Sequence, residues 1–353
     1  TQLLDRHEIR YGWGREGTQE GFDFSTSKQG RMATSSRTLV VNTNQTKATL
    51  VKVLFEPQAK LSDSLTYDIT AWSLPYAYGL EALACTNLVP ENPAEITANV
   101  RNDLSPDALA FVTDWKSIKD AQFLADLLKR NIRVRLASKS FKMNGEQYEP
   151  GSLIIAKSDN VHNPDFLITL DKMVEKNKIL IEPMTDLDGN GPVLKIEDTR
   201  GIHDIRIAVL SGDPTDPLVF GEIWHFFEQQ LKYPITVLNG DYFRSVDLSL
   251  YDVLVLPDGD YGNFFNKEQM KYLKKWIQTG GKTIAMGGAI KAISQEKDFG
   301  ITPIMERNRM DRNRTYGRSE RDEIKDEITG AIFKTEVDNS QPLAYGYGDT
   351  YFS

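Results

Sequence analysis

The sequence predicts an α/β protein whose C-terminal part is built on a parallel, doubly wound β-sheet. The first observation is a pair of almost entirely apolar runs, IRIAVLSG at 205–212 and YDVLVLPDGDYG at 251–262, each ending in a polar loop. The second is that amphipathic segments of helical length follow them, at 218–232 and 267–280. Strands that are apolar throughout are typically buried on both faces, and their alternation with helices is typical of parallel sheets.

The third observation is a glycine turn after a further apolar strand, in GGKTIAMGGAIKAI at 280–293. In many α/β enzymes a turn between a buried strand and a helix carries the nucleophile. Here the turn offers Gly287, Gly288 and Ala289, so it has no Cys, Ser or Thr. Glycines suit such a turn on structural grounds alone, because they have no Cβ to clash with the neighbouring backbone.

The chain is long enough for two or three domains, at 353 residues. Residues 1–105 are predicted to form an irregular, partly β region, with strands at 37–42 and 48–57. Residues 106–200 are predicted to form a small α/β domain, and residues 201–353 the doubly wound domain.

The small α/β domain is expected to hold two helices, at 118–130 and 163–177, and strands at 109–115, 132–137 and 179–184. Residues 144–157 are expected to form a turn that leads into another strand. Ser117 is the predicted N-cap of the first helix. Apolar residues recur there at helical spacing, namely at Ala121, Leu124, Leu127 and Leu128.

Composition and charge exclude several classes of function. The net charge of −8 argues against a general binder of nucleic acid or of membrane surfaces, but leaves room for a local basic patch. No apolar run approaches the ~20 residues that span a bilayer, and the first ten residues do not resemble a signal peptide. Cys85 stands in an apolar run and is expected to be a buried, inert thiol.

The candidate site residues lie in three loops that follow the predicted strands. They are Ser211, Asp213 and Thr215; Asp258, Asp260 and Tyr261; and Gly287 with Gly288. In an open parallel sheet such loops meet at the carboxyl ends of the strands, where ligands bind. Two interpretations stay open: a pocket for a small molecule or peptide, walled by Trp224 and Tyr261, or ordinary turns in which Gly and Asp are good loop formers.

Residues 186–197 (DLDGNGPVLKIE) match a calcium-binding loop in full, with oxygen donors at Asp186, Asp188, Asn190 and Glu197. A calcium hand also needs a helix on each side of the loop. The sequence instead predicts a strand before the loop and irregular structure after it, so a glycine-rich turn between domains is favoured. The four histidines lack the spacing of a zinc site, and no HxxE or HExxH motif occurs.

Four phrases carry a resemblance to a known protein type: LTYDITAWSLPYAYGLEA at 65–82, FGEIWHFFEQQL at 220–231, YDVLVLPDGDY at 251–261 and NSQPLAYGYG at 339–348. Together they resemble the C-terminal half of bacterial multidomain zinc carboxypeptidases of the carboxypeptidase A-like family. In addition, residues 201–353 resemble the class I glutamine-amidotransferase-like fold, a flavodoxin-like sheet. Catalytic members of that fold use a cysteine at the glycine turn and a histidine later in the chain. Here the turn has no cysteine, and no histidine follows His225.

The resemblance implies a non-catalytic accessory region that acts as a scaffold or positions substrate for a separate zinc carboxypeptidase domain. No catalytic residue carries over, and no cofactor is expected in this chain, since the zinc belongs to that other domain. The implied partners are the catalytic domain and a peptide or small-molecule ligand, in the periplasm or outside the cell. An amidotransferase-type enzyme that uses Ser211 is a further alternative. Within the phrase at 65–82, Trp72 is expected to anchor a buried aromatic interface.

Overall fold

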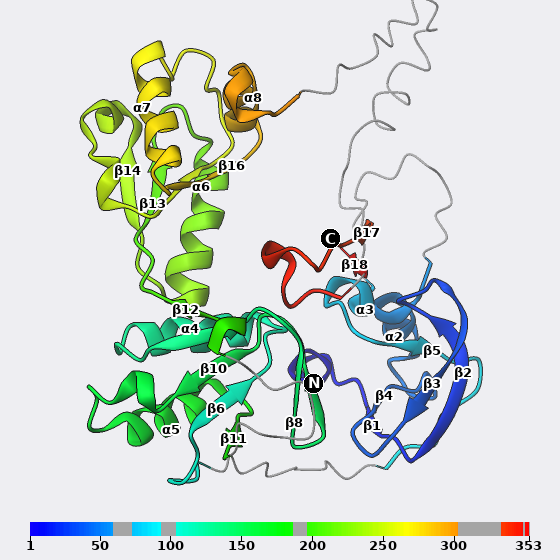
Figure 1. Ribbon diagram of the computed structural model, residues 1–353. Coiled ribbons are helices and arrows are strands. Elements are labelled where there is room, and N and C mark those ends of the chain that lie inside the picture. Colours follow the sequence, from blue (N-terminus) through cyan, green and yellow to red (C-terminus); the bar gives the residue numbers. More distant parts are fainter. Residues whose placement is uncertain (59–72, 93–103, 186–195, 303–332, 349, 353) are drawn as a thin grey trace, which may run out of the picture. The chain divides into compact units, whose positions relative to one another are not determined.

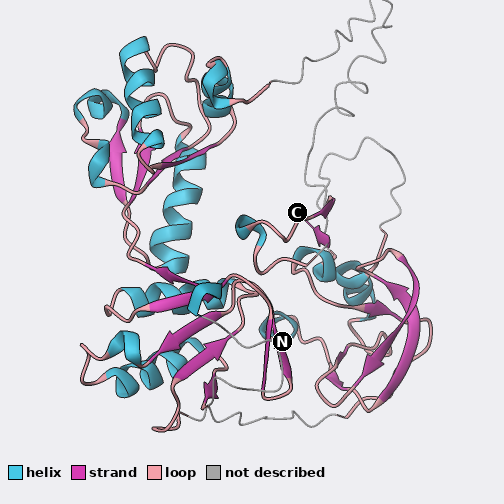
Figure 2. Ribbon diagram, in the orientation of Figure 1, coloured by secondary structure: helices cyan, strands magenta, loops and turns pink. Residues whose placement is uncertain are grey.

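The computed structural model describes residues 1–58, 73–92, 104–185, 196–302, 333–348 and 350–352 (Figure 1). The chain divides into two compact units, Thr1–Val100 with Met310–Ser353, and Arg101–Arg309. The protein is a mixed α/β protein with several sheets, one of which is a four-stranded parallel sheet (Figure 2). None of the helices in the described ranges is long and apolar enough to cross a membrane.

The first unit contains short helices and small antiparallel sheets. Its helices are α1 (Gln2–Arg6), α2 (Ala48–Phe55), α3 (Leu74–Ala77) and the 3-10 turn η7 (Pro342–Ala344). Its strands are β1 (Gly12–Trp13), β2 (Gly17–Asp23), β3 (Lys28–Thr34), β4 (Leu39–Val40), β5 (Leu83–Ala84), β17 (Lys334–Glu336) and β18 (Thr350–Phe352). They form the sheets β1-β4, β3-β2-β5 and β17-β18.

One sequence-based prediction for this unit is wrong. The expected strand at 48–57 is the helix α2, in which Val51 and Leu54 are buried together with Leu4 and Ile9. Val51 and Leu54 are three positions apart, a spacing that places two side chains on one helix face. Burial of that face therefore outweighs the β-propensity of the β-branched residues. The expected strand at 37–42 is present as the two-residue strand β4.

Only part of the aromatic segment at 65–82 lies in the described residues. Trp72, its expected anchor, is outside them. Tyr76 packs edge-on against Phe24, with ring centroids 4.9 Å apart, so this part of the segment contributes to the interior of the first unit. Tyr78, in contrast, is 65% exposed.

The second unit begins with a five-stranded sheet in the order β11-β6-β10-β7-β12, in which all neighbours are antiparallel. The strands of this part are β6 (Ala110–Thr113), β7 (Val134–Ala137), β8 (Phe141–Met143), β9 (Glu146–Tyr148), β10 (Leu153–Ala156), β11 (Glu182–Met184) and β12 (Thr199–Ile202). Its helices are α4 (Ile118–Leu128), η1 (Ser158–Asn160), α5 (Phe166–Asn177) and η2 (Ile196–Asp198).

Two hydrophobic clusters cover the two faces of this sheet. On one face α4 and α5 pack against Phe111 and Ile155, which are completely buried. On the other face the hairpin β8–β9 contributes Phe141 and Tyr148, whose rings stack. Ser117 is the N-cap of helix α4, as the sequence predicts: the backbone N–H of Ser117 donates to Asp120 Oδ2 over 2.7 Å in a capping box.

Asp126 joins α4 to α5. Its buried carboxylate accepts hydrogen bonds from Lys176 Nζ at 2.6 Å and Asn177 Nδ2 at 3.1 Å. Burial by itself raises the pKa of Asp126, but the bonds from Lys176 and Asn177 outweigh it, and the pKa lies below its ordinary value of 3.8. The ionised carboxylate therefore stabilises the folded state.

Stability from Asp126 should be fully present above pH ~4 and should be lost as the pH falls through the lowered folded-state pKa. We expect Asp126→Asn to reduce the free energy of unfolding at pH 7 and to flatten its decline in acid. Urea unfolding at pH 7, 5 and 3 measures both effects. Asp171→Asn, at an exposed position of α5, is the control and should change the value at pH 7 by less than ~0.5 kcal/mol. An Asp126→Asn protein that declines as steeply as the wild type would contradict this account.

The rest of the second unit is the predicted parallel sheet, with strands β13 (Ile207–Ser211), β14 (Thr236–Asn239), β15 (Val253–Leu256) and β16 (Lys282–Ala285) in the order β14-β13-β15-β16. All three pairings are parallel, so this prediction is confirmed. The helices are α6 (Pro217–Trp224), α7 (Lys267–Gln278) and α8 (Gly288–Ser294), with the short turns η4 (Gly240–Ser245), η5 (Leu248–Leu250) and η6 (Lys297–Phe299).

Helices cover both faces of the parallel sheet. Helices α7 and α8 pack on one face, where Leu273, Trp276 and Ala289 meet the buried strand residues. Helix α6 covers the other face through Ile223, which packs against Val209 and Val255. The predicted helix at 218–232 starts as α6 and continues as the π-helix η3 (His225–Leu231), a difference in hydrogen bonding rather than in position.

Candidate functional site

The predicted site lies at the carboxyl edge of the parallel sheet. The chain passes from β13 to β14 on one side and then to β15 on the other side of β13. The gap between β13 and β15 is therefore the point where the strand order reverses, and ligands of open parallel sheets bind outside such a point. The loops that follow β13, β15 and β16 all begin at this edge.

Backbone contacts bring these loops together. Thr215, after β13, forms an isolated antiparallel bridge with Gly259, after β15. The N–H of Asp216 donates to the Asp258 carbonyl over 2.8 Å, and the N–H of Asp260 donates to the Pro214 carbonyl over 2.9 Å. A Cβ on Gly259 would lie only 2.0 Å from the Pro214 carbonyl oxygen. The loops after β13 and β15 are therefore held together by backbone hydrogen bonds.

Asp258 connects the same loops to the glycine turn after β16. Its Oδ1 accepts hydrogen bonds from the N–H groups of Gly259 at 2.7 Å and Gly288 at 2.6 Å. Gly287 has φ +49° and ψ −118°, which residues with a side chain rarely adopt. A Cβ on Gly287 would lie 2.1 Å from Asp258 Oδ1. The Asp258 carboxylate therefore occupies the space into which a side chain at Gly287 would extend.

The hydroxyl groups of the predicted site are bonded within the protein. Ser211 Oγ is half-buried and donates to the Leu238 carbonyl at 3.3 Å. Thr215 Oγ1 donates to the Gly212 carbonyl at 2.7 Å. Tyr261 OH is buried and donates to the Pro257 carbonyl at 2.9 Å. Burial, together with the nearby Asp258 charge, raises the pKa of Tyr261 well above its ordinary value, so the phenol stays protonated.

Tyr261 and Trp224 do not wall a common pocket. Tyr261 is 2% exposed and belongs to the hydrophobic cluster under α7 and α8. Trp224 is the last residue of α6, which packs on the opposite face of the sheet. Of the predicted site residues, Asp213, Asp260 and Gly287 are exposed at the carboxyl edge.

The calcium-loop match is only partly described. Asp186, Asp188 and Asn190 lie outside the described residues, whereas Glu197 is in the 3-10 turn η2. The strand β11 precedes the loop and η2 follows it, so the flanks are not the two helices of a calcium hand. Within the described ranges, no three His, Cys, Asp or Glu side chains are grouped to hold a metal ion.

Cys85 has no features of a reactive thiol. It is half-buried in the first unit, and burial raises the pKa of its thiol above the ordinary value. A thiol with a raised pKa carries little thiolate at neutral pH, and the thiolate is the nucleophilic form.

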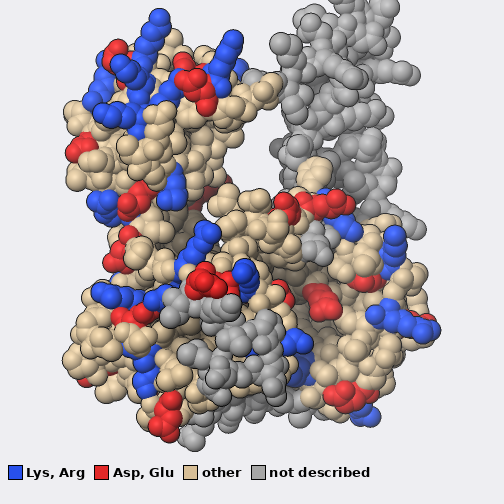
Figure 3. All heavy atoms as spheres, in the orientation of Figure 1, with Lys and Arg blue, Asp and Glu red and all other residues tan. Residues whose placement is uncertain are grey.

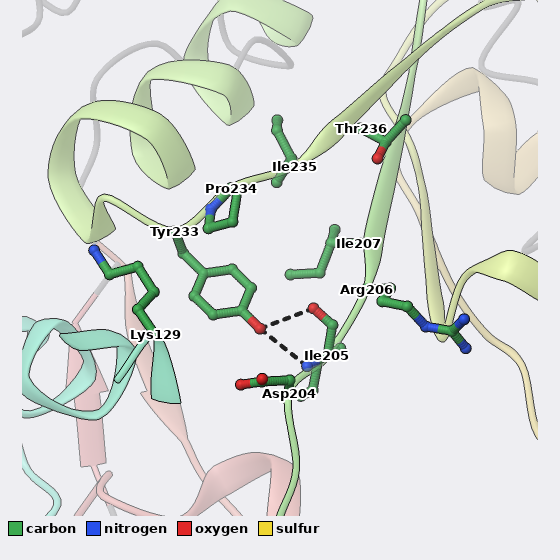
Figure 4. Close-up of a pocket in the computed structure, with 9 residues that line it drawn as sticks. All are labelled: Lys129, Asp204, Ile205, Arg206, Ile207, Tyr233, Pro234, Ile235 and Thr236. Atoms are coloured by element: carbon green, nitrogen blue, oxygen red, sulfur yellow. Dashed lines mark hydrogen bonds between the residues drawn. The ribbon is translucent and has the colours of Figure 1, made fainter. Parts of the chain in front are cut away.

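A cavity of about 300 Å³ lies at the opposite, amino end of the sheet (Figure 4). It is lined by Lys129, Asp204, Ile205, Arg206, Ile207, Tyr233, Pro234, Ile235 and Thr236. The Tyr233 hydroxyl donates to the carbonyl of Ile205 and accepts from its N–H, both at 2.9 Å, and Arg206 is paired with Asp252. None of the predicted site residues lines this cavity. No sequence pattern predicts this cavity, since its walls are ordinary strand and turn residues.

Comparisons of the chain with protein-family models, with curated proteins and with solved structures found no match.

Proposed function

We propose that this chain is a non-catalytic accessory region, which acts as a scaffold or positions substrate for a separate catalytic domain. In this proposal the parallel-sheet domain has the flavodoxin-like fold of class I glutamine amidotransferases without their catalytic pair. The strand order supports this assignment, because β14-β13-β15-β16 corresponds to the first four strands of the flavodoxin-like order 2-1-3-4-5.

The observation that carries the proposal is the contact between Asp258 and the glycine turn. A nucleophile at Gly287 would need room for its side chain, and that room is taken by the Asp258 carboxylate. A reacting oxyanion would need free backbone donors, and the N–H of Gly288 already donates to Asp258. Hydrolysis by a covalent route also needs a base beside the nucleophile. The arrangement favours a structural role for this turn.

The kind of catalytic domain is proposed from the sequence resemblance alone. The four phrases quoted above resemble the accessory half of bacterial zinc carboxypeptidases, so the proposed partner is a zinc carboxypeptidase domain that holds the metal and cleaves C-terminal residues from peptides. A periplasmic or extracellular location follows from the same resemblance.

The proposal is tested with the source gene and the whole protein that it encodes. The source gene should encode a zinc-peptidase domain together with this chain. Deleting residues 1–353 from that whole protein should change kcat/KM for peptide substrates, while the isolated chain, supplied with zinc, should hydrolyse neither C-terminal peptide substrates nor glutamine. One zinc ion per chain together with peptidase activity in the isolated chain would refute it, as would a source gene without a peptidase domain. Turnover abolished by Ser211→Ala would instead establish the amidotransferase-type alternative.

A binding module for small molecules or peptides is the second candidate. The exposed side chains of Asp213 and Asp260 beside the strand-order reversal favour it, although Asp260 Oδ1 already accepts a hydrogen bond from the Gly262 N–H at 3.1 Å. A thermal-shift panel of amino acids, peptides, sugars and nucleotides separates the two candidates. A compound that raises the melting temperature of the wild type, and not that of an Asp260→Asn variant, would support binding at this edge.

A further inference from the structure

Helix α7 carries a row of lysines on its exposed side. Lys267, Lys271 and Lys275 are all exposed, and they are spaced four positions apart. Residues at this spacing lie on one face of a helix, about 6 Å apart along its axis. Met270, Leu273 and Trp276 form the buried side of the same helix. The three lysines therefore point away from the sheet.

Two more lysines extend this row onto the neighbouring elements. Lys291 of α8 is exposed, and it lies on the side of that helix away from the buried Ala289 and Ile293. Lys297 of η6 is exposed as well. Helices α7 and α8 pack on the same face of the parallel sheet, so their exposed sides face the same way. Figure 3 shows Lys and Arg side chains over these elements, with Asp and Glu side chains between them. We call Lys267, Lys271, Lys275, Lys291 and Lys297 the lysine face.

The acidic residues of this region neutralise a different lysine. Glu296 and Asp298 both bind Lys274, at 2.5 and 2.9 Å. Glu268 is exposed on α7 beside the row. Among the described residues, none of the five lysines of the lysine face forms an ion pair. The lysine face is thus a local positive surface on a chain whose net charge is −8.

The row of lysines on α7 lowers the stability of that helix. Like charges four positions apart destabilise a helix by a few tenths of a kcal/mol for each pair. Lys267 also stands at the first position of α7, where the helix dipole disfavours a cation. An anionic partner would relieve both effects.

The composition of the lysine face indicates the kind of partner. Protein interfaces are depleted in Lys and are centred on aromatic or Arg anchors. Sequence readout of nucleic acid uses Arg, Lys, Asn or Gln on base edges, and single strands also stack on aromatic rings. The lysine face has no Arg. The hydroxyl of the exposed Tyr272 accepts a hydrogen bond from the Leu248 N–H at 3.0 Å. Lysines are point charges that need no fixed geometry, which suits the mobile headgroups of a lipid surface.

We propose that the lysine face docks the protein reversibly onto an anionic lipid surface. The contact is mainly electrostatic, with the exposed side chains of Tyr272 and Ile290 as the large apolar neighbours of the lysines. It goes beyond the accessory role proposed above, and neither proposal depends on the other.

The test is co-sedimentation of the full chain with vesicles of phosphatidylcholine, alone or with 30% phosphatidylglycerol. We expect binding to the anionic vesicles at 20 mM salt, none to the neutral ones, and release at 500 mM salt, where charges are screened within a few ångströms. The triple variant Lys267→Gln, Lys271→Gln, Lys275→Gln should bind roughly 100-fold more weakly, since each lysine contributes about five-fold. Gln is also a good helix former, so α7 should stay folded.

A matched control removes three exposed lysines elsewhere in the same unit, in the variant Lys119→Gln, Lys142→Gln, Lys172→Gln. It makes the same change in net charge and should alter binding by less than about three-fold if the lysine face is the site. Equal losses in the two variants would overturn the proposal, as would a wild-type chain that does not sediment with anionic vesicles. Binding to single-stranded DNA or poly-glutamate but not to vesicles would also overturn it.

Discussion

Replacing Gly287 with alanine should lower the free energy of unfolding by about 2–6 kcal/mol. The new Cβ would lie 2.1 Å from Asp258 Oδ1, far inside van der Waals contact. Forcing an extra carbon into a packed site costs about 1–3 kcal/mol, and holding a residue with a side chain at φ +49° costs a further 1–3 kcal/mol or so.

The clash with Asp258 is tested by a double-mutant cycle. Asp258→Ala alone removes the acceptor of two N–H groups and should cost about 1.5–3 kcal/mol. Because Asp258→Ala also removes the atom that Gly287→Ala would meet, the double variant should be more stable than the sum of the single variants predicts, by at least about 1 kcal/mol. Urea unfolding followed by tryptophan fluorescence gives all four values.

The control for backbone strain is Gly300→Ala. Gly300 has φ +65°, and a Cβ there would meet nothing within 4 Å. This variant should therefore cost only about 1 kcal/mol, the price of the left-handed conformation. Strictly additive effects of Gly287→Ala and Asp258→Ala would show that the carboxylate does not block the turn. In that case the main support for the proposed non-catalytic role would be lost.

The sequence predicted the glycine turn but could not predict what fills it. The apolar strand and the two glycines identify the turn, because short-range pattern and local backbone freedom are visible in a single chain. Asp258, however, lies 30 positions before Gly288. Its role depends on which strands become neighbours and on a hydrogen bond between two loops. The same Asp in a loop is equally compatible with an ordinary turn or a ligand site.

The same distinction explains the outcome across the chain. The parallel sheet was predictable because its strands are apolar throughout and alternate with helices, so one pattern specifies both layers. The hairpin of β2 and β3 was not predicted, since its residues are mostly polar or glycine and the sequence shows no apolar alternation. The seven-residue backbone ladder joins the two strands, and the exposed ion pair between Glu20 and Arg31, which sit opposite each other, adds a cross-strand contact.

Replacing Leu127 with alanine should destabilise the antiparallel-sheet part of the second unit by about 2–5 kcal/mol. Leu127 is completely buried, and it belongs to the cluster that joins α4 and α5 to the sheet. Leucine and alanine have similar helix propensity, so the loss comes from packing rather than from the helix. The size of the loss depends on how far the neighbours Phe123 and Leu170, also completely buried, can close the cavity.

Leu218→Ala is the matched control, because it makes the same change in another helix of the same unit. Leu218 is 77% exposed on α6, so its truncation should change the free energy of unfolding by less than ~0.5 kcal/mol. Urea unfolding monitored by circular dichroism compares the two variants under one condition. Equal losses would mean that Leu127 does not pack in a closed core. A loss of more than ~2 kcal/mol for Leu218→Ala would instead show that the exposed side of α6 is covered in solution, by another copy of the chain or by a part of the chain outside the described residues.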